Sequence, residues 1–179
     1  MVTARLFIAV DIPEYIRSTI SDFRIPSDAA KIRWVEKDNI HLTLRFLGDT
    51  EEKRLDEIVN ALRKVEFSPF RCSVSGFGVF PDMHRPRVIW AGITPEDDVI
   101  YLHKKIDDAL DDPGFQKEMF TSHITIGRVK IVSDLLKMEK HLHELMEKHF
   151  SMAFTVSCFK LKKSTLTPDG PVYEDVMSF

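Results

Sequence analysis

The sequence predicts an α+β fold, in one domain over residues 1–179 that is made of two related halves. Four segments carry apolar residues at helical spacing, and short runs rich in β-branched and aromatic residues lie between them. A tetrapeptide, His41-Leu42-Thr43-Leu44, recurs 82 residues later as His123-Ile124-Thr125-Ile126. Each copy lies in a predicted strand that is followed by a predicted helix. This pattern predicts two similar lobes, each a small sheet with helices against it, because a solenoid has shorter and more numerous repeats.

The predicted helices combine apolar periodicity with residues that favour a helix N-terminus. The first begins at Pro13, since proline suits the first helical position, and its apolar face continues to Phe23. The other three cover residues 50–66, 95–112 and 133–149, with starts predicted at a capping pair of Asp49 and Glu52, at Thr94 with Pro95, and at Ser133.

The predicted strands flank and separate these helices. Apolar runs of strand length predict them, and the prolines and glycine of residues 168–171 predict the turn between the last two strands. The predicted ranges are 4–11, 32–35, 40–47, 70–79, 87–93, 122–128, 152–162 and 172–178.

Length and composition exclude several classes of protein. The chain of 179 residues is 44% hydrophobic and carries a net charge of −3, which is too apolar and too weakly charged for a disordered protein. No apolar run approaches the roughly 20 residues that cross a bilayer. Asp11 interrupts the apolar start, so we expect a strand there and not a signal peptide. Cys72 and Cys158 lie in strand-like segments, which predicts no disulfide framework and favours the reducing cytoplasm.

The charges are unevenly distributed along the chain. A net charge of −3 opposes non-specific coating of nucleic acid. The helix segments 50–66, 95–112 and 133–149 hold 16 acidic and 9 basic residues, whereas the rest of the chain holds 12 acidic and 16 basic residues. If the helices cover the outer faces, the strands and loops give the inner side a positive field that attracts a phosphate chain.

The repeated tetrapeptide predicts a polar site. Alternate residues of a strand share one face and lie roughly 6.5–7 Å apart. His41 and Thr43 therefore project together while the two leucines turn into the core, and the second copy places His123 and Thr125 in the same way. If the two lobes face each other across a pseudo-two-fold axis, two imidazoles and two hydroxyls converge on one cleft.

This quartet suits displacement at phosphorus, in which one oxygen attacks and another leaves in line. Imidazole titrates near neutrality and can serve as the base on one side and the acid on the other. Hydroxyls can donate hydrogen bonds to the non-bridging oxygens. The chemistry requires no metal and no cofactor. A single His-x-Thr-x more often marks a half-exposed polar face, so structural coincidence is the alternative to a catalytic pair.

Three arginines are candidate substrate-binding residues. Arg45 is in phase with the first motif, so a regular strand would aim it at the cleft. Arg128 is one residue out of phase with the second motif and reaches the cleft only if Gly127 permits a bulge or the strand ends there. By the alternation of side chains along a strand, Arg45 is the better candidate. For both Arg45 and Arg128, the alternative is a solvated position on the surface. Arg5 and Phe7 could also point inward, with core packing the alternative for Phe7.

Five segments along nearly the whole chain carry a resemblance to a known family. They are Arg5-Leu6-Phe7-Ile8-Ala9, His41-Leu42-Thr43-Leu44-Arg45-Phe46-Leu47-Gly48, Arg87-Val88-Ile89-Trp90-Ala91-Gly92, His123-Ile124-Thr125-Ile126-Gly127-Arg128, and Ser164-Thr165-Leu166 followed by Gly170-Pro171-Val172-Tyr173. With these segments the chain resembles the two-histidine (2H) phosphoesterase superfamily, and within it the RNA 2′,3′-cyclic phosphodiesterases, also called 2′-5′ RNA ligases. Relatives usually carry proline before the second histidine, where this chain has Ser122.

The resemblance implies a fold and a reaction. It implies two lobes of antiparallel sheet lining a central cleft, and hydrolysis of a terminal RNA 2′,3′-cyclic phosphate to a 2′-phosphomonoester. It implies that His41 is the proton donor to the leaving 3′ oxygen and His123 the proton acceptor from water. Thr43 and Thr125 would hold the phosphate oxygens. The family also places a phosphate-contacting arginine at the Arg128 position, and on this point we follow the resemblance over parity.

Two other functions fit the same residues. The reverse reaction, joining a cyclic end to a 5′-hydroxyl in tRNA or other RNA end processing, uses the same acid and base. A non-catalytic nucleotide-binding module would use the same cleft but has no need of two titrating histidines. The expected partners are RNA ends or cyclic nucleotides as substrate, with no membrane and no obligate protein partner implied.

Overall fold

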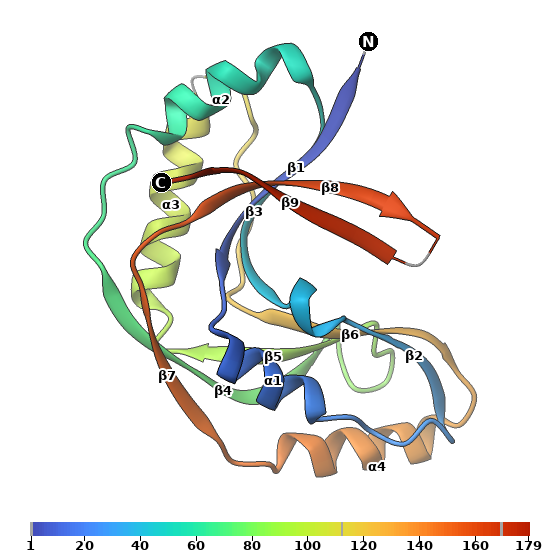
Figure 1. The fold of residues 1–179 in the computed structure, drawn as a ribbon. Coiled ribbons are helices and arrows are strands. Elements are labelled where there is room, and N and C mark those ends of the chain that lie inside the picture. Colours follow the sequence, from blue (N-terminus) through green and yellow to red (C-terminus); the bar gives the residue numbers. More distant parts are fainter. Residues whose placement is uncertain (1, 112, 169) are drawn as a thin grey trace.

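The computed structural model describes residues 2–111, 113–168 and 170–179, and it places two antiparallel sheets one over the other (Figure 1). The first sheet has the strand order β3-β1-β8-β9, and the second the order β2-β6-β5-β4-β7. The first comprises β1 (Thr3–Asp11), β3 (His41–Glu51), β8 (Lys160–Thr167) and β9 (Gly170–Ser178), and the second β2 (Ala30–Trp34), β4 (Phe70–Phe80), β5 (Val88–Thr94), β6 (Ile124–Val132) and β7 (Ser151–Val156). The predicted α+β fold with two lobes is confirmed.

Helices lie along the outside of the two sheets. α3 (Asp97–Asp111) packs on β3 and contacts α2 (Leu55–Leu62), whereas α4 (Leu135–Met146) packs on β4 of the second sheet (Figure 1). α1 (Glu14–Asp22) contacts the short 3-10 helix η1 (Lys37–Asn39), and a second 3-10 helix, η2 (Glu52–Arg54), leads into α2. No helix in the described part of the chain is long and apolar enough to span a membrane.

Alternating burial along the strands fixes which face each motif presents. Leu42, Leu44, Ile124 and Ile126 are each at most 2% exposed, so the apolar residues of both tetrapeptides enter the core as predicted. Burying a side chain of this size stabilises the fold by roughly 1.5–3 kcal/mol. The histidines and threonines of the motifs, at the alternate positions, are only partly buried and face the other way.

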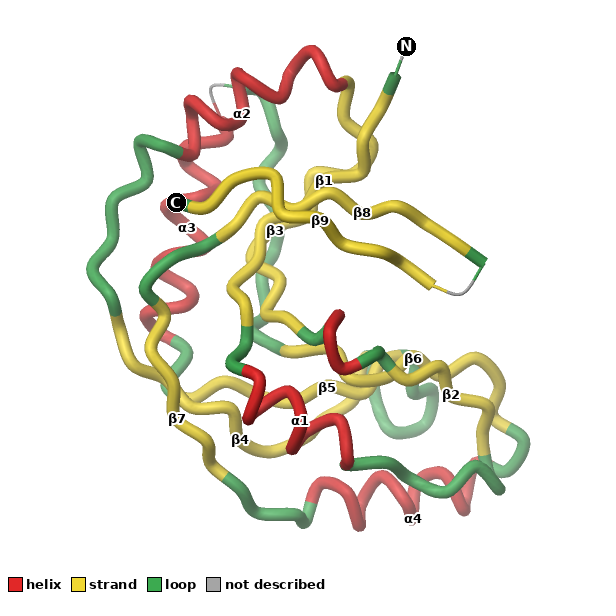
Figure 2. The backbone as a smooth tube through the Cα atoms, viewed as in Figure 1, coloured by secondary structure: helices red, strands yellow, loops and turns green. Residues whose placement is uncertain are grey.

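The two lobes are interleaved along the chain and not formed by its successive halves. β1, β3, β8 and β9 belong to one sheet, while β2 and the run from β4 to β7 belong to the other (Figure 2). The connection from β7 to β8 carries the chain from the second sheet back to the first. β3, which begins at His41, and β6, which begins directly after His123, contact each other between the lobes.

Some predicted boundaries are wrong. β3 continues to Glu51, so Asp49 pairs across the sheet with Arg5 and does not cap a helix. α3 begins at Asp97, after Thr94 has ended β5, and the range 152–162 is divided between β7 and β8. Within the predicted turn at 168–171, Asp169 lies outside the described residues, as does Asp112 at the end of the predicted third helix.

Candidate active site

A cleft between the two sheets contains all four polar residues of the repeated motifs. Its cavity volume is about 840 Å³, and it is lined by His41 and Thr43 from the first sheet and by His123 and Thr125 from the second. The predicted convergence of the two motifs is therefore what the structure shows.

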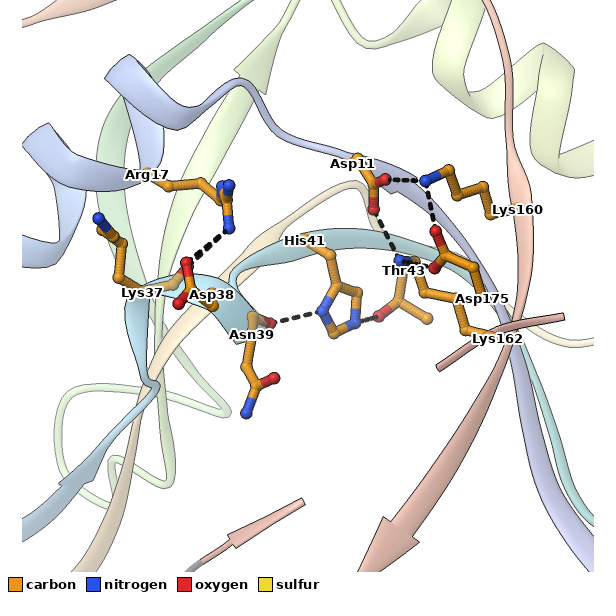
Figure 3. A network of polar contacts seen from close by, with 10 residues as sticks. All are labelled: Asp11, Arg17, Lys37, Asp38, Asn39, His41, Thr43, Lys160, Lys162 and Asp175. Carbon is orange, nitrogen blue, oxygen red and sulfur yellow. Dashed lines mark hydrogen bonds and ion pairs between the residues drawn. The ribbon is translucent and has the colours of Figure 1, made fainter. Parts of the chain in front are cut away.

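The two histidines are anchored in the same way. Nδ1 of His41 donates to the carbonyl of Asn39 at 2.7 Å, and Nδ1 of His123 donates to the carbonyl of Thr121 at 2.7 Å. A carbonyl only accepts, so each Nδ1 carries the proton and each Nε2 is left to exchange protons in the cleft. Nε2 of His41 lies 2.8 Å from Oγ1 of Thr43, which also faces the cleft (Figure 3).

Aromatic rings fix the orientation of both imidazoles. His41 packs against Phe7, with ring centroids 5.0 Å apart, and edge-on against Tyr173 at 5.3 Å. Phe7 and Tyr173 are themselves 4.9 Å apart, so the three rings form one cluster. His123 meets Phe80 edge-on at 5.0 Å. Phe7 is 3% exposed and also lines the cleft, so it serves both the core and the site.

Burial sets the protonation of the first histidine. Desolvation lowers the pKa of His41 to about 4, against the opposing effects of the Asn39 hydrogen bond and the Asp11 carboxylate. The positive charges of Lys162 and Arg128 lower this pKa further. Arg128 belongs to β6, so its charge acts across the cleft on a residue of the other sheet.

A compact cluster of four charges lies beside the first motif on the same sheet. Asp11 and Asp175 each pair with both Lys160 and Lys162, at nitrogen–oxygen distances from 2.5 to 2.8 Å (Figure 3). Burial raises the pKa of Asp11 and Asp175, but the lysine hydrogen bonds outweigh it, and the pKa of each carboxyl lies below its usual value. The carboxylates occupy both lysines, so these cations are paired within the sheet.

A β-bulge in each motif strand decides which arginine faces the cleft. In β3, Ala9 pairs with Thr43 and Ile8 with Arg45, which leaves Leu44 as an extra residue. In β6, the matching shift leaves Ile126 between the paired residues Thr125 and Gly127. One extra residue reverses the parity of the positions that follow.

The expectation that Arg45 faces the cleft is therefore wrong. Arg45 is 5% exposed, lies on the helix side of β3, and pairs with Asp107 of α3. Arg128, by contrast, lines the cleft, as the family resemblance implied. The bulge falls at Ile126, and Gly127 serves a different need, because a Cβ there would lie 2.8 Å from the ring of Trp34.

The remaining predicted residue and several unpredicted ones complete the site. Arg5 lines the cleft while it pairs with Asp49 at 3.1 Å. The sequence analysis did not predict Trp34, Phe46, Lys130 and Tyr173 as site residues, although they also line the cleft. The repeat could have pointed to Phe46 and Lys130. Its 82-residue offset aligns Phe46 with Arg128, which is a candidate site residue, and it aligns Lys130 with Gly48. The charged side chains that line the cleft are Arg5, Arg33, Glu36, Arg128 and Lys130, an excess of basic groups as the charge distribution predicted.

The chain matches a known family and its curated members along most of its length. A family model described as LigT like Phosphoesterase matches residues 6–90 and 92–173. An RNA 2′,3′-cyclic phosphodiesterase of Methanocaldococcus jannaschii is 38% identical over 171 residues, covering 95% of this chain and 96% of that protein. One of Thermotoga maritima is 38% identical over 175 residues, covering 95% and 91%.

Solved structures agree with this match. Escherichia coli LigT, in a crystal structure with 3′-AMP, superposes with a TM-score of 0.79 at 25% identity, covering 99% of this chain and 98% of that one. TT0787 of Thermus thermophilus superposes with a TM-score of 0.76 at 28% identity, covering 98% and 96%. This chain belongs to the LigT-like phosphoesterase family, as the two His-x-Thr-x motifs and their flanks predicted.

Proposed function

We propose that this protein hydrolyses the 2′,3′-cyclic phosphate at the end of an RNA chain to a 2′-phosphomonoester. One observation carries the proposal. Two histidines from facing sheets, each with Nδ1 donating to a backbone carbonyl, bring Nε2 into one cleft that also holds two threonines and Arg128. The names of the relatives support the same substrate class.

The reaction assigns one role to each group. His123 Nε2 accepts a proton from water as the water oxygen attacks phosphorus. The bond from phosphorus to the 3′ oxygen breaks, and His41 Nε2 donates its proton to that oxygen. Thr43 and Thr125 donate hydrogen bonds to the non-bridging phosphate oxygens, and the positive charge of Arg128 offsets the negative charge of these oxygens. Each imidazole is expected to contribute about 10²–10⁴-fold.

The low pKa of His41 bears on its role as the acid. The imidazolium is disfavoured mainly because burial removes it from water. A bound phosphodiester brings a negative charge beside the ring, and an opposite charge within a few ångströms favours the charged form. We therefore expect substrate binding to raise the pKa of His41 and to load it with the proton that the leaving oxygen needs.

Product analysis tests the proposal directly. A short RNA ending in 2′,3′-cyclic phosphate is incubated with the protein in the presence of EDTA, and the position of the phosphate is read by phosphorus NMR. We expect a 2′-phosphate, the same rate without EDTA, and a rate about 10²–10⁴-fold lower in matched His41→Ala and His123→Ala variants that remain folded. Tight nucleotide binding with no turnover would mean a binding module. Joined products that dominate once a 5′-hydroxyl RNA is added would mean that ligation is the favoured direction.

A further inference from the structure

Arg45 is a buried cation that lies outside the cleft and joins three parts of the chain. Its guanidinium reaches Asp107 of α3 at 2.9 Å and Glu118 at 2.5 Å, and it also donates to the carbonyl of Gln116. A buried charge costs several kcal/mol unless it is paired and hydrogen-bonded. At 5% exposure, Arg45 thus depends on both carboxylates, and it binds β3 and α3 to the segment 115–123, which has no helix or strand up to His123.

Two further contacts hold the same segment. The backbone N–H of Glu118 donates to Asp107 at 3.2 Å. The ring of Phe120 stacks on His103 of α3, with centroids 4.3 Å apart and planes 11° apart. His103 in turn donates from Nδ1 to the carbonyl of Leu44, the extra residue of the β3 bulge, at 2.8 Å. These residues, Arg45, His103, Asp107, Glu118 and Phe120, are named here the Arg45 cluster.

The Arg45 cluster ends one residue before the backbone group that anchors the second histidine. Phe120 is followed by Thr121, whose carbonyl accepts the Nδ1–H of His123 at 2.7 Å. Ser122, between them, is 6% exposed. The position of the Thr121 carbonyl, and with it the tautomer and ring orientation of His123, therefore depends on how firmly residues 116–120 are held.

The second motif has nothing that could take the place of this arginine. The 82-residue offset aligns Arg45 with Gly127, which has no side chain. The second motif strand contacts the approach to the first histidine through its backbone instead, because the N–H of Val35 donates to the carbonyl of Ile126 at 2.9 Å.

We infer that Arg45 is a positioning residue for His123. It couples the two motifs, because the bulge that removes Arg45 from the cleft aims it at the segment that orients the general base. The inference rests on the proposed function for its kinetic consequence, but not for its structural one. A displacement of about 1 Å in a catalytic group can cost on the order of 100-fold in rate.

The test compares Arg45→Met and Glu118→Gln with Lys117→Met as the matched control. Lys117 also pairs the segment to α3, through Asp108 and Asp111, but it is exposed and lies outside the Arg45 cluster. For RNA 2′,3′-cyclic phosphate we expect kcat of Arg45→Met to fall about 10- to 100-fold with KM within twofold. The kcat of Glu118→Gln should fall less than that of Arg45→Met, and Arg45→Lys should retain part of the kcat that Arg45→Met loses. The kcat of Lys117→Met should equal that of the wild type.

A spectroscopic measurement separates this inference from the proposed function. In histidine-labelled protein without substrate, nitrogen NMR should show His123 losing its single Nδ1–H tautomer in Arg45→Met, while the His41 signals keep theirs. If Arg45→Met does not fold, the same readouts on Glu118→Gln decide. A lower melting temperature with wild-type kcat and unchanged His123 signals would overturn the inference. Wild-type protein without turnover would overturn the proposed function and leave the NMR comparison standing.

Discussion

The two motif strands present the same chemistry on supports of different kinds. The carbonyl that orients His41 belongs to Asn39, the last residue of η1, whose N–H donates to Glu36 at 2.8 Å. The Asn39 side chain also donates to the carbonyl of Pro171 in β9 at 2.8 Å. The carbonyl that orients His123 lies in a segment without helix or strand, which is held through the Arg45 cluster.

This difference shows that a sequence repeat conserves the position of a catalytic group without conserving what holds it. On one side a short 3-10 helix is joined to α1 by Arg17 and to β9 by the Asn39 side chain, whereas on the other side a segment without helix or strand is held by side chains from β3 and α3. Substitutions far from the cleft should therefore affect His123 more than His41. Substitutions on each side of the cleft test how alike the two sides are.

Removing either imidazole tests whether the two motifs contribute equally to the reaction. We expect His41→Ala and His123→Ala each to lower kcat by about 10²–10⁴-fold, because each removes one proton transfer in the transition state. Steady-state kinetics on RNA 2′,3′-cyclic phosphate measures this, with circular dichroism as the control for folding. Full activity in either variant would contradict the acid–base pair.

The position that differs between the motifs tests what each side of the cleft binds. Arg128 lies where the first motif has Phe46, which is 56% exposed and also lines the cleft. We expect Arg128→Met to lower kcat/KM by about 10- to 100-fold, since it removes a charge-assisted hydrogen bond to phosphate. The loss should shrink as salt rises, whereas Phe46→Ala should leave the salt dependence unchanged. A similar salt response in both variants would count against Arg128 as the phosphate contact.

The desolvation of His41 should appear in the stability of the free protein. Its pKa of about 4 lies below the value near 6.5 of an unfolded histidine, so the unfolded chain binds more protons between these values. Stability from this group is present above pH 6.5 and is lost as the pH falls toward 4. Between pH 7 and pH 5 we expect the wild type to lose about 2 kcal/mol more unfolding free energy than His41→Gln. Equal losses in urea titrations would show that His41 is not desolvated.

The smallest effect is expected at Arg5. Its guanidinium already pairs with Asp49 at the exposed edge of the cleft, and surface ion pairs contribute little. We expect Arg5→Met to change kcat/KM by less than about fivefold. A loss as large as that of Arg128→Met would place Arg5 on the substrate phosphate as well.

Strand parity could be predicted from the sequence only as far as the first bulge. The apolar faces of both motifs and the outward histidines and threonines follow from a period of two. The directions of Arg45 and Arg128 do not follow from this period, because pairing with β1 and β5 determines that Leu44 and Ile126 are the extra residues. Nothing local in the sequence marks an unpaired residue in a strand.

Longer-range pairing also explains the wrong boundaries. Aspartate is a residue type that often caps helices, but Asp49 lies opposite Arg5 of β1, and β3 continues past it. The apolar pattern of residues 152–162 continues across the passage from β7 to β8, where the chain changes sheets. In both places the partner strand decides the structure, and it lies far away in the sequence.

The dependence of the rate on pH tests the central claim most directly. Single-turnover rates on RNA 2′,3′-cyclic phosphate are measured across pH for the wild type and both alanine variants. The wild type should give a bell, because the base must be neutral and the acid protonated. His123→Ala should lose only the rise on the acidic side, and His41→Ala only the fall on the alkaline side. Both limbs surviving in either variant, or the same limb lost in both, would contradict an acid–base pair shared between the two motifs.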